Sequence, residues 1–162
     1  YDTEYERNGT CNIFFFFYPL KGKRKAKVTE RRTKLDWAHF MKDLIDEEYS
    51  QAEKVVLVLD NLNTHTGSAL YEAFEPAEAK RLLDKLEIHY TPKHGSWLNM
   101  VEIELSHLSR QCLDRRIPDR ETFHQEVSAW VQQRNHEGAS VDWRFTTVDA
   151  RIKLMTLYPT VN

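Results

Sequence analysis

Asp60 stands where the sequence pattern favours chemistry. It follows five uninterrupted apolar residues, Val55 to Leu59, and precedes the turn former Asn61. Such a β-branched and leucine-rich run predicts a strand buried on both faces. An ionised carboxylate at its end is unfavourable unless a positive group meets it, so Asp60 is the first candidate for a functional residue. The alternative is that Asp60 and Asn61 simply begin a turn, because both residue types favour turns.

A second candidate carboxylate lies on a helix that apolar spacing predicts over Leu98–Leu113. A carboxylate at a strand end that faces one on a nearby helix suits Mg²⁺ or Mn²⁺, which prefer oxygen ligands. Two such ions, about 3.5–4 Å apart, can stabilise the attacking and leaving oxygens of a phosphodiester displacement. Glu102 and Glu104 flank the apolar stripe on opposite edges. The spacing therefore leaves open which of them faces the sheet, or whether both are ordinary exposed glutamates.

The elements that must position these groups follow an α/β order. Cys11–Leu20 predicts a central strand, which forms a hairpin with a second strand over Arg24–Thr33. Strands then alternate with helices, which indicates a mixed sheet flanked by helices. The remaining elements are a helix over Leu35–Tyr49, the strand that ends at Asp60, a helix over Ser68–Leu86 with Pro76 as a break, a strand over Leu86–Thr91, the helix over Leu98–Leu113, a helix capped by Asp119 that ends near Asn135, and a helix over Thr147–Leu157.

Composition narrows the class of protein. The 162 residues suit one domain, spanning 1–162, with a sizeable core. A net charge of −2 excludes a polycation built for nonspecific nucleic-acid binding. Two distant cysteines, Cys11 and Cys112, fit a reducing cytosol rather than a disulfide framework, and the histidines lack zinc-site spacing. Neither a membrane span nor a signal peptide is visible, so we expect no membrane partner.

The basic run over residues 22–34 (GKRKAKVTERRTK) leaves two interpretations open. It is either a solvated hairpin face, with lysines that protect an edge strand, or a DNA-facing surface. The tryptophans Trp97, Trp130 and Trp143 are more typical of core packing than of base stacking.

Two segments resemble catalytic blocks of the DDE transposases of the IS630/Tc1-mariner superfamily. The segment VLVLDNLNTHT resembles a block of Asp-Asn-x-x-x-His at the end of a buried strand, which is matched here by Asp60, Asn61 and His65. The segment YTPKHGSWLNMVEIELSHLSRQ resembles a block of the form Ser-Pro-x-Leu-Asn-Pro-Ile-Glu-x-x-Trp, which is matched by Leu98, Asn99 and Glu102. The resemblance selects Glu102 over Glu104.

The positions at which this sequence departs from the family pattern do not include the two carboxylates. Met100 and Val101 replace a frequent Pro-Ile pair, and Leu105 replaces a frequent tryptophan. With these replacements the sequence resembles a bacterial IS630-like branch of the superfamily. The segments ERNGT and VTERRT also resemble that branch, so the resemblance covers nearly the whole chain. It implies an RNase H-like fold, which agrees with the element order, and a bacterial cytoplasmic, nucleoid-associated location.

Two parts of the family pattern have no match. The family's first catalytic aspartate lies on a strand that precedes IFFFFY, and its helix-turn-helix DNA-binding region lies further upstream. Asp2 sits in a polar stretch without an apolar strand before it and is not a substitute. We therefore expect the C-terminal part of a transposase catalytic domain, which lacks the first strand of the fold and carries two of three metal-binding carboxylates.

The resemblance also implies roles. Asp60 and Glu102 would be the catalytic residues and would each hold one Mg²⁺ or Mn²⁺ ion, while the missing aspartate would bridge the two ions. DNA, as transposon ends and target, would be the substrate. The supporting residues would be Asn61, His65 and Asn99. Candidates for contacts with DNA phosphates are Lys93 and His94, which otherwise form an exposed turn, and Arg31 and Arg32, for which a solvated edge is the more natural interpretation.

Three functions compete at this stage. The first is metal-dependent DNA cleavage and strand transfer. The second is a catalytically inactive RNase H-like fragment that acts as a dimerising or DNA-binding module; an exposed sheet edge would favour a homodimer. The third, a cellular RNase H-like nuclease, fits less well because Asn61, His65, Leu98 and Asn99 match transposases.

Overall fold

The computed structural model describes residues 9–60, 62, 65–92, 95 and 98–155. In this part of the chain the strands form two two-stranded sheets: β1 (Asn12–Tyr18) with β2 (Lys23–Thr29), and β3 (Val55–Leu59) with β4 (Leu86–Tyr90). The prediction of one mixed sheet with β1 at its centre is therefore wrong for the described residues. The α/β class and the predicted order of elements are confirmed.

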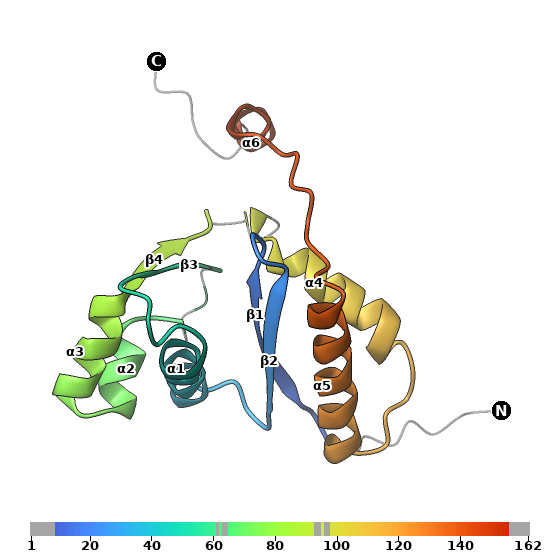
Figure 1. Ribbon diagram of the computed structural model, residues 1–162, viewed down its shortest axis with the longest axis horizontal. Coiled ribbons are helices and arrows are strands. Elements are labelled where there is room, and N and C mark those ends of the chain that lie inside the picture. The colour runs from blue at the N-terminus through green and yellow to red at the C-terminus, as the bar shows by residue number, and fades with distance from the viewer. Residues whose placement is uncertain (1–8, 61, 63–64, 93–94, 96–97, 156–162) are drawn as a thin grey trace.

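The β1–β2 hairpin is antiparallel and is covered on both faces (Figure 1). Alternate residues of a strand point to opposite faces. Phe14 and Phe16 pack into a core cluster with α1 (Lys34–Asp43), while Ile13 and Phe15 pack into a second cluster with the C-terminal helices. An unbroken aromatic run therefore suits this strand, because both faces meet apolar neighbours.

Helix α1 begins at a capping box formed by Thr33 and Asp36, and continues into a π-helical turn over Leu44–Glu48. Trp37 and Phe40 are almost fully buried, whereas Leu35 is 47% exposed. The buried side of the helix therefore includes Trp37 but not Leu35, which lies in the first turn.

Strands β3 and β4 are parallel, with Val55 opposite Leu86 and Leu59 opposite Tyr90. Helices α2 (Ser68–Ala73) and α3 (Pro76–Lys85) connect them, and the predicted break at Pro76 is confirmed. Val55 and Leu57 are buried, but Val56 is 62% exposed and Val58 is 51% exposed. The prediction that this strand is buried on both faces is therefore wrong.

The C-terminal half begins with α4 (Val101–Leu108) and a π-helical turn over Ser109–Leu113. Helix α5 (Arg120–His136) follows, and the predicted cap is confirmed because Asp119 accepts a hydrogen bond from the Thr122 N–H at 2.8 Å. Trp130 lies in the core beside Phe15. Helix α6 (Thr147–Leu154) lies apart from the other elements (Figure 1).

Candidate active site

Asp60 lies directly after β3, at the end of the parallel pair. A hydrogen bond from the Thr91 N–H to the Leu59 carbonyl, at 2.8 Å, holds the ends of β3 and β4 together beside it. His65 Nδ1 lies 2.8 Å from Asp60 Oδ1. Since an ionised carboxylate only accepts hydrogen bonds, Nδ1 carries the proton and donates it. One oxygen of Asp60 is thus fixed, while about a third of its side chain remains exposed.

His65 is itself held by three elements. Its ring stacks on Trp37 of α1, with centroids 5.9 Å apart, and lies 6.3 Å from the ring of Phe14 on β1. The Tyr90 hydroxyl donates to the His65 carbonyl at 2.8 Å. His65 Nε2 is buried and makes no hydrogen bond with any described residue. The imidazole therefore has a fixed ring position and one unused nitrogen.

Glu102 occupies the first turn of α4, and Asn99 organises that turn. The Asn99 side-chain oxygen accepts from the Val101 N–H at 3.2 Å, and its carbonyl accepts from the Glu102 N–H at 3.0 Å. The Glu102 side chain is exposed and has no hydrogen bond or ion pair with the described residues. Its carboxylate is available to an external partner.

Glu104, two residues further along α4, is in the opposite situation. Its carboxylate is 1% exposed and pairs with the buried guanidinium of Arg24 on β2 and, at 3.3 Å, with Arg134 on α5. Burial raises the pKa of this carboxyl, but the hydrogen bond and charge of Arg24, with those of Arg134, outweigh burial and hold the pKa below its usual value. Glu104 is committed to this cluster.

Strand β1 contacts the surroundings of both candidate carboxylates. His65, which holds Asp60, contacts Phe14 of β1, and α4 packs beside β1 as well. Figure 1 shows the carboxyl ends of β3 and β4 pointing toward this strand, near which α4 begins. No three His, Cys, Asp or Glu side chains form a metal-binding group within the described part of the chain.

Of the four residues predicted to contact DNA, the structure describes Arg31 and Arg32, and these two do not lie near the start of α4. Arg31 and Arg32 are exposed in the connection between β2 and α1, at the opposite end of the hairpin from the start of α4 (Figure 1). Asn61, Lys93 and His94 lie outside the described residues.

The hairpin lysines are neutralised by acidic residues at the end of α1 and in the turn after it. The pairs are Lys23 with Glu48 at 2.9 Å, Lys25 with Glu47 at 2.6 Å and Lys27 with Asp43 at 2.6 Å. These pairs favour the solvated interpretation of the basic run over a DNA-facing one.

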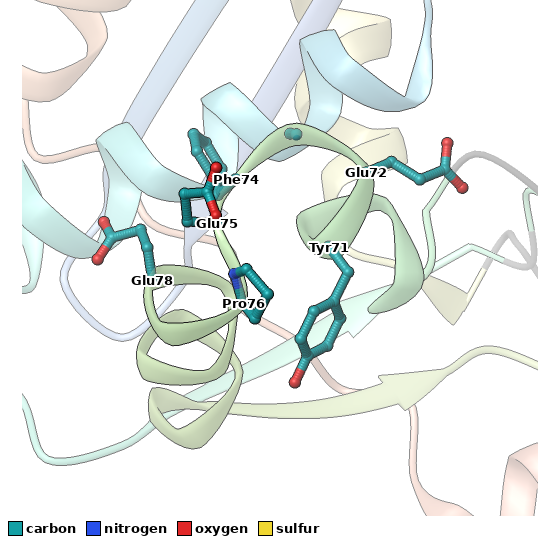
Figure 2. A pocket seen from close by; sticks show the side chains of 7 residues that line it. Tyr71, Glu72, Phe74, Glu75, Pro76 and Glu78 are labelled. Carbon is teal, nitrogen blue, oxygen red and sulfur yellow. The ribbon is translucent and has the colours of Figure 1, made fainter.

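A hollow of about 630 Å³ lies at the junction of α2 and α3, away from both candidate carboxylates. Figure 2 shows Glu72 and Glu78 on either side of it, pointing away from each other. Glu72 pairs with Lys34, and Glu78 pairs with Lys42 and Arg81. The hollow therefore lacks converging free polar groups and is not a candidate site.

Sequence reasoning missed two residues that shape the site, Trp37 and Tyr90. The signal for Trp37 was present, because Trp37, Met41 and Leu44 have the i, i+4, i+7 spacing of a buried helical face. Tyr90 gave no such signal, since its hydrogen bond joins residues 25 positions apart.

Comparison with known families identifies the superfamily of the chain. The α/β order of helices and small sheets is compatible with an RNase H-like fold. The family model of the DDE superfamily endonucleases matches residues 1–124, and the chain belongs to this family. No curated protein and no solved structure matches significantly. None of the helices described is long and apolar enough to cross a membrane.

Proposed function

We propose that this chain is the catalytic domain of an IS630/Tc1-mariner-type transposase, which cleaves DNA and transfers strands with Mg²⁺ or Mn²⁺ at Asp60 and Glu102. The observation that carries the proposal is the contrast on α4. Glu104 is buried in an ion pair, whereas Glu102 is exposed and unpaired among the described residues. Mg²⁺ is commonly bound by one or two carboxylates plus substrate phosphates, which fits this pair.

In this proposal each residue has a separate task. His65 Nδ1–H holds Oδ1 of Asp60, which restricts rotation of the carboxylate and would leave its second oxygen for a metal ion. Asn99 fixes the first turn of α4 and hence the direction of Glu102. When bound, divalent ions would activate the attacking oxygen and stabilise the leaving oxygen.

The third carboxylate would come from a further strand that joins the two sheets. Within the described residues, β1 pairs only with β2 and β3 pairs only with β4. Phe14 of β1 nevertheless shares a core cluster with Val55 and Leu57 of β3. The two sheets share one core, and each has an open edge. A strand inserted between these edges would join them into one sheet. In this proposal that strand carries the bridging aspartate.

The alternative is a catalytically inactive module that keeps the fold without the chemistry. The buried Arg24–Glu104 pair and both core clusters are independent of Asp60 and Glu102, which favours this alternative for the chain on its own. Metal binding and DNA nicking separate the two functions.

Calorimetric titration with Mn²⁺ tests the proposal. We expect weak binding to the unaltered chain and its loss in Asp60→Ala and in Glu102→Ala, with the fold retained because neither side chain is in the core. Glu53→Ala, which removes an exposed carboxylate elsewhere, is the matched control and should bind normally. Equal binding in all three variants would refute the proposal.

A nicking assay on supercoiled plasmid complements the titration. The chain alone should nick DNA negligibly if, as proposed, a third carboxylate from a further strand is needed to complete the site. Robust, Mn²⁺-dependent nicking that Asp60→Ala abolishes would show that two carboxylates suffice and would overturn the proposed third ligand.

A further inference from the structure

The β3–β4 sheet has one uncovered face. Val56 and Val58 point to it, with exposed fractions of 62% and 51%. The parallel register places Glu87 beside Val56 and His89 beside Val58, on the same face. Glu87 and His89 pair with each other at 2.8 Å and are each more than half exposed. This face, defined by these four residues, is an apolar centre bordered by an acidic side chain.

Helix α6 carries a complementary surface. Val148, Ile152 and Met155 recur at i, i+4 and i+7, so they share one side of the helix, and each is more than 60% exposed. Arg151 lies next to this apolar stripe on the helical surface. Such an amphipathic helix is stabilised mainly by packing its apolar side against a partner. Helix α6 lies outside residues 1–124, which match the endonuclease family.

We infer that α6 of one chain docks on the uncovered β3–β4 face of a second copy, and that the exchange is reciprocal. The apolar stripe would cover Val56 and Val58, and Arg151 would meet the carboxylate of Glu87. One chain thus supplies both halves of the interface, which permits a closed two-fold dimer in which the same contact occurs twice.

The connection between α5 and α6 favours docking of α6 on a second copy rather than on the sheet of its own chain. Its start is fixed, because the buried Arg24 guanidinium donates to the Ala139 carbonyl at 2.5 Å. Residues 139–146 have no helix or strand and lead away from the body, so α6 stands off from its own sheet (Figure 1). Reciprocal exchange also doubles the buried area, toward the roughly 1,000 Å² that a specific interface needs. The inference does not depend on metal binding or catalysis.

Sedimentation equilibrium of the chain measures this association. We expect a concentration-dependent mass between 19.2 kDa and twice that value at micromolar concentration. Ile152→Asp and Val58→Lys should each weaken dimerisation about a hundredfold, because burial of an unpaired charge costs at least tenfold per contact and the contact occurs twice. Ala150→Asp, on the opposite side of α6, is the matched control and should leave the dissociation constant within twofold.

A mixing experiment distinguishes helix exchange from other modes of association. In an equimolar mixture of Ile152→Asp and Val58→Lys, one docking site is unaltered and the other pairs an aspartate with a lysine. The mixture should therefore associate more tightly than either variant alone. Circular dichroism and urea midpoints show that both variants fold. A chain that stays monomeric at about 100 micromolar, where a dissociation constant of about 1 micromolar would give mainly dimer, would overturn the inference. A dimer whose dissociation constant is unchanged by both substitutions would also overturn it.

Discussion

The two sheets differ in how many of their faces are covered. Strand β1 presents Ile13 and Phe15 to one core cluster and Phe14 and Phe16 to the other. Strand β3 presents Val55 and Leu57 to the core, while Val56 and Val58 remain mostly exposed. Both strands are nevertheless unbroken apolar runs in the sequence.

The difference separates a structural half, β1–β2, from a more accessible half, β3–β4, which carries the candidate residue Asp60. The β1–β2 half is closed by the Arg24–Glu104–Arg134 cluster, which joins a strand to two helices. The β3–β4 half keeps its strand ends, Asp60 and one whole face accessible. A buried cluster of ion pairs holds its elements in place, and residues that bind ligands can then lie at an accessible end of the fold.

The largest expected effect is a difference in the free energy of unfolding between variants of the two glutamates of α4. Glu104→Ala leaves the Arg24 guanidinium buried without its carboxylate, which should lower the free energy of unfolding by about 3–5 kcal/mol. Glu102→Ala, two residues away, removes an exposed side chain and should change it by less than about 0.5 kcal/mol. Urea denaturation monitored by tryptophan fluorescence measures both.

Glu104→Gln is the control for this comparison. It retains an oxygen that can accept from Arg24, so its loss of stability should fall between those of the two alanine variants. Similar small losses in Glu104→Ala and Glu102→Ala would contradict the assignment of Glu104 to the structural half.

A smaller effect is expected between neighbouring residues of β3. Leu57→Ala removes a side chain that is 5% exposed and should cost about 2–4 kcal/mol, because it leaves a cavity in the core. Val58→Ala should cost less than about 0.5 kcal/mol in the monomer. Thermal or urea unfolding at submicromolar protein concentration avoids any contribution from self-association. A large loss in Val58→Ala under these conditions would show that the face is covered within one chain.

The sequence predicted the order of elements because their periodicity is local. The break at Pro76 and the cap at Asp119 were also local signals, since each depends on residues within one helical turn. Coverage of a strand face is a different kind of property. It depends on which distant helix packs there, so the apolar runs around Phe15 and Val56 look alike in the sequence but have different environments.

For the candidate site, sequence spacing left Glu102 and Glu104 undecided, and only the family resemblance favoured Glu102. The structure supplies an independent physical distinction, because Arg24 lies 80 positions away in the sequence and meets Glu104. The contact between His65 and Trp37 is non-local in the same way. Motif spacing therefore located the carboxylates, whereas their surroundings depended on tertiary packing.

The smallest expected effect is the pH dependence of the stabilisation that the Glu104 cluster gives to the structural half. The pKa of Glu104 is lowered in the folded chain relative to its ordinary value of 4.5, because Arg24 and Arg134 outweigh its burial. A lowered pKa means that this stabilisation is fully present above pH 4.5 and is lost as the pH falls through the folded pKa. The difference in unfolding free energy between the unaltered chain and Glu104→Gln should therefore be constant from pH 7 to 5 and shrink below about pH 4. A difference that stays constant down to pH 3 would mean that the Glu104 cluster stabilises the fold through its shape rather than its charge.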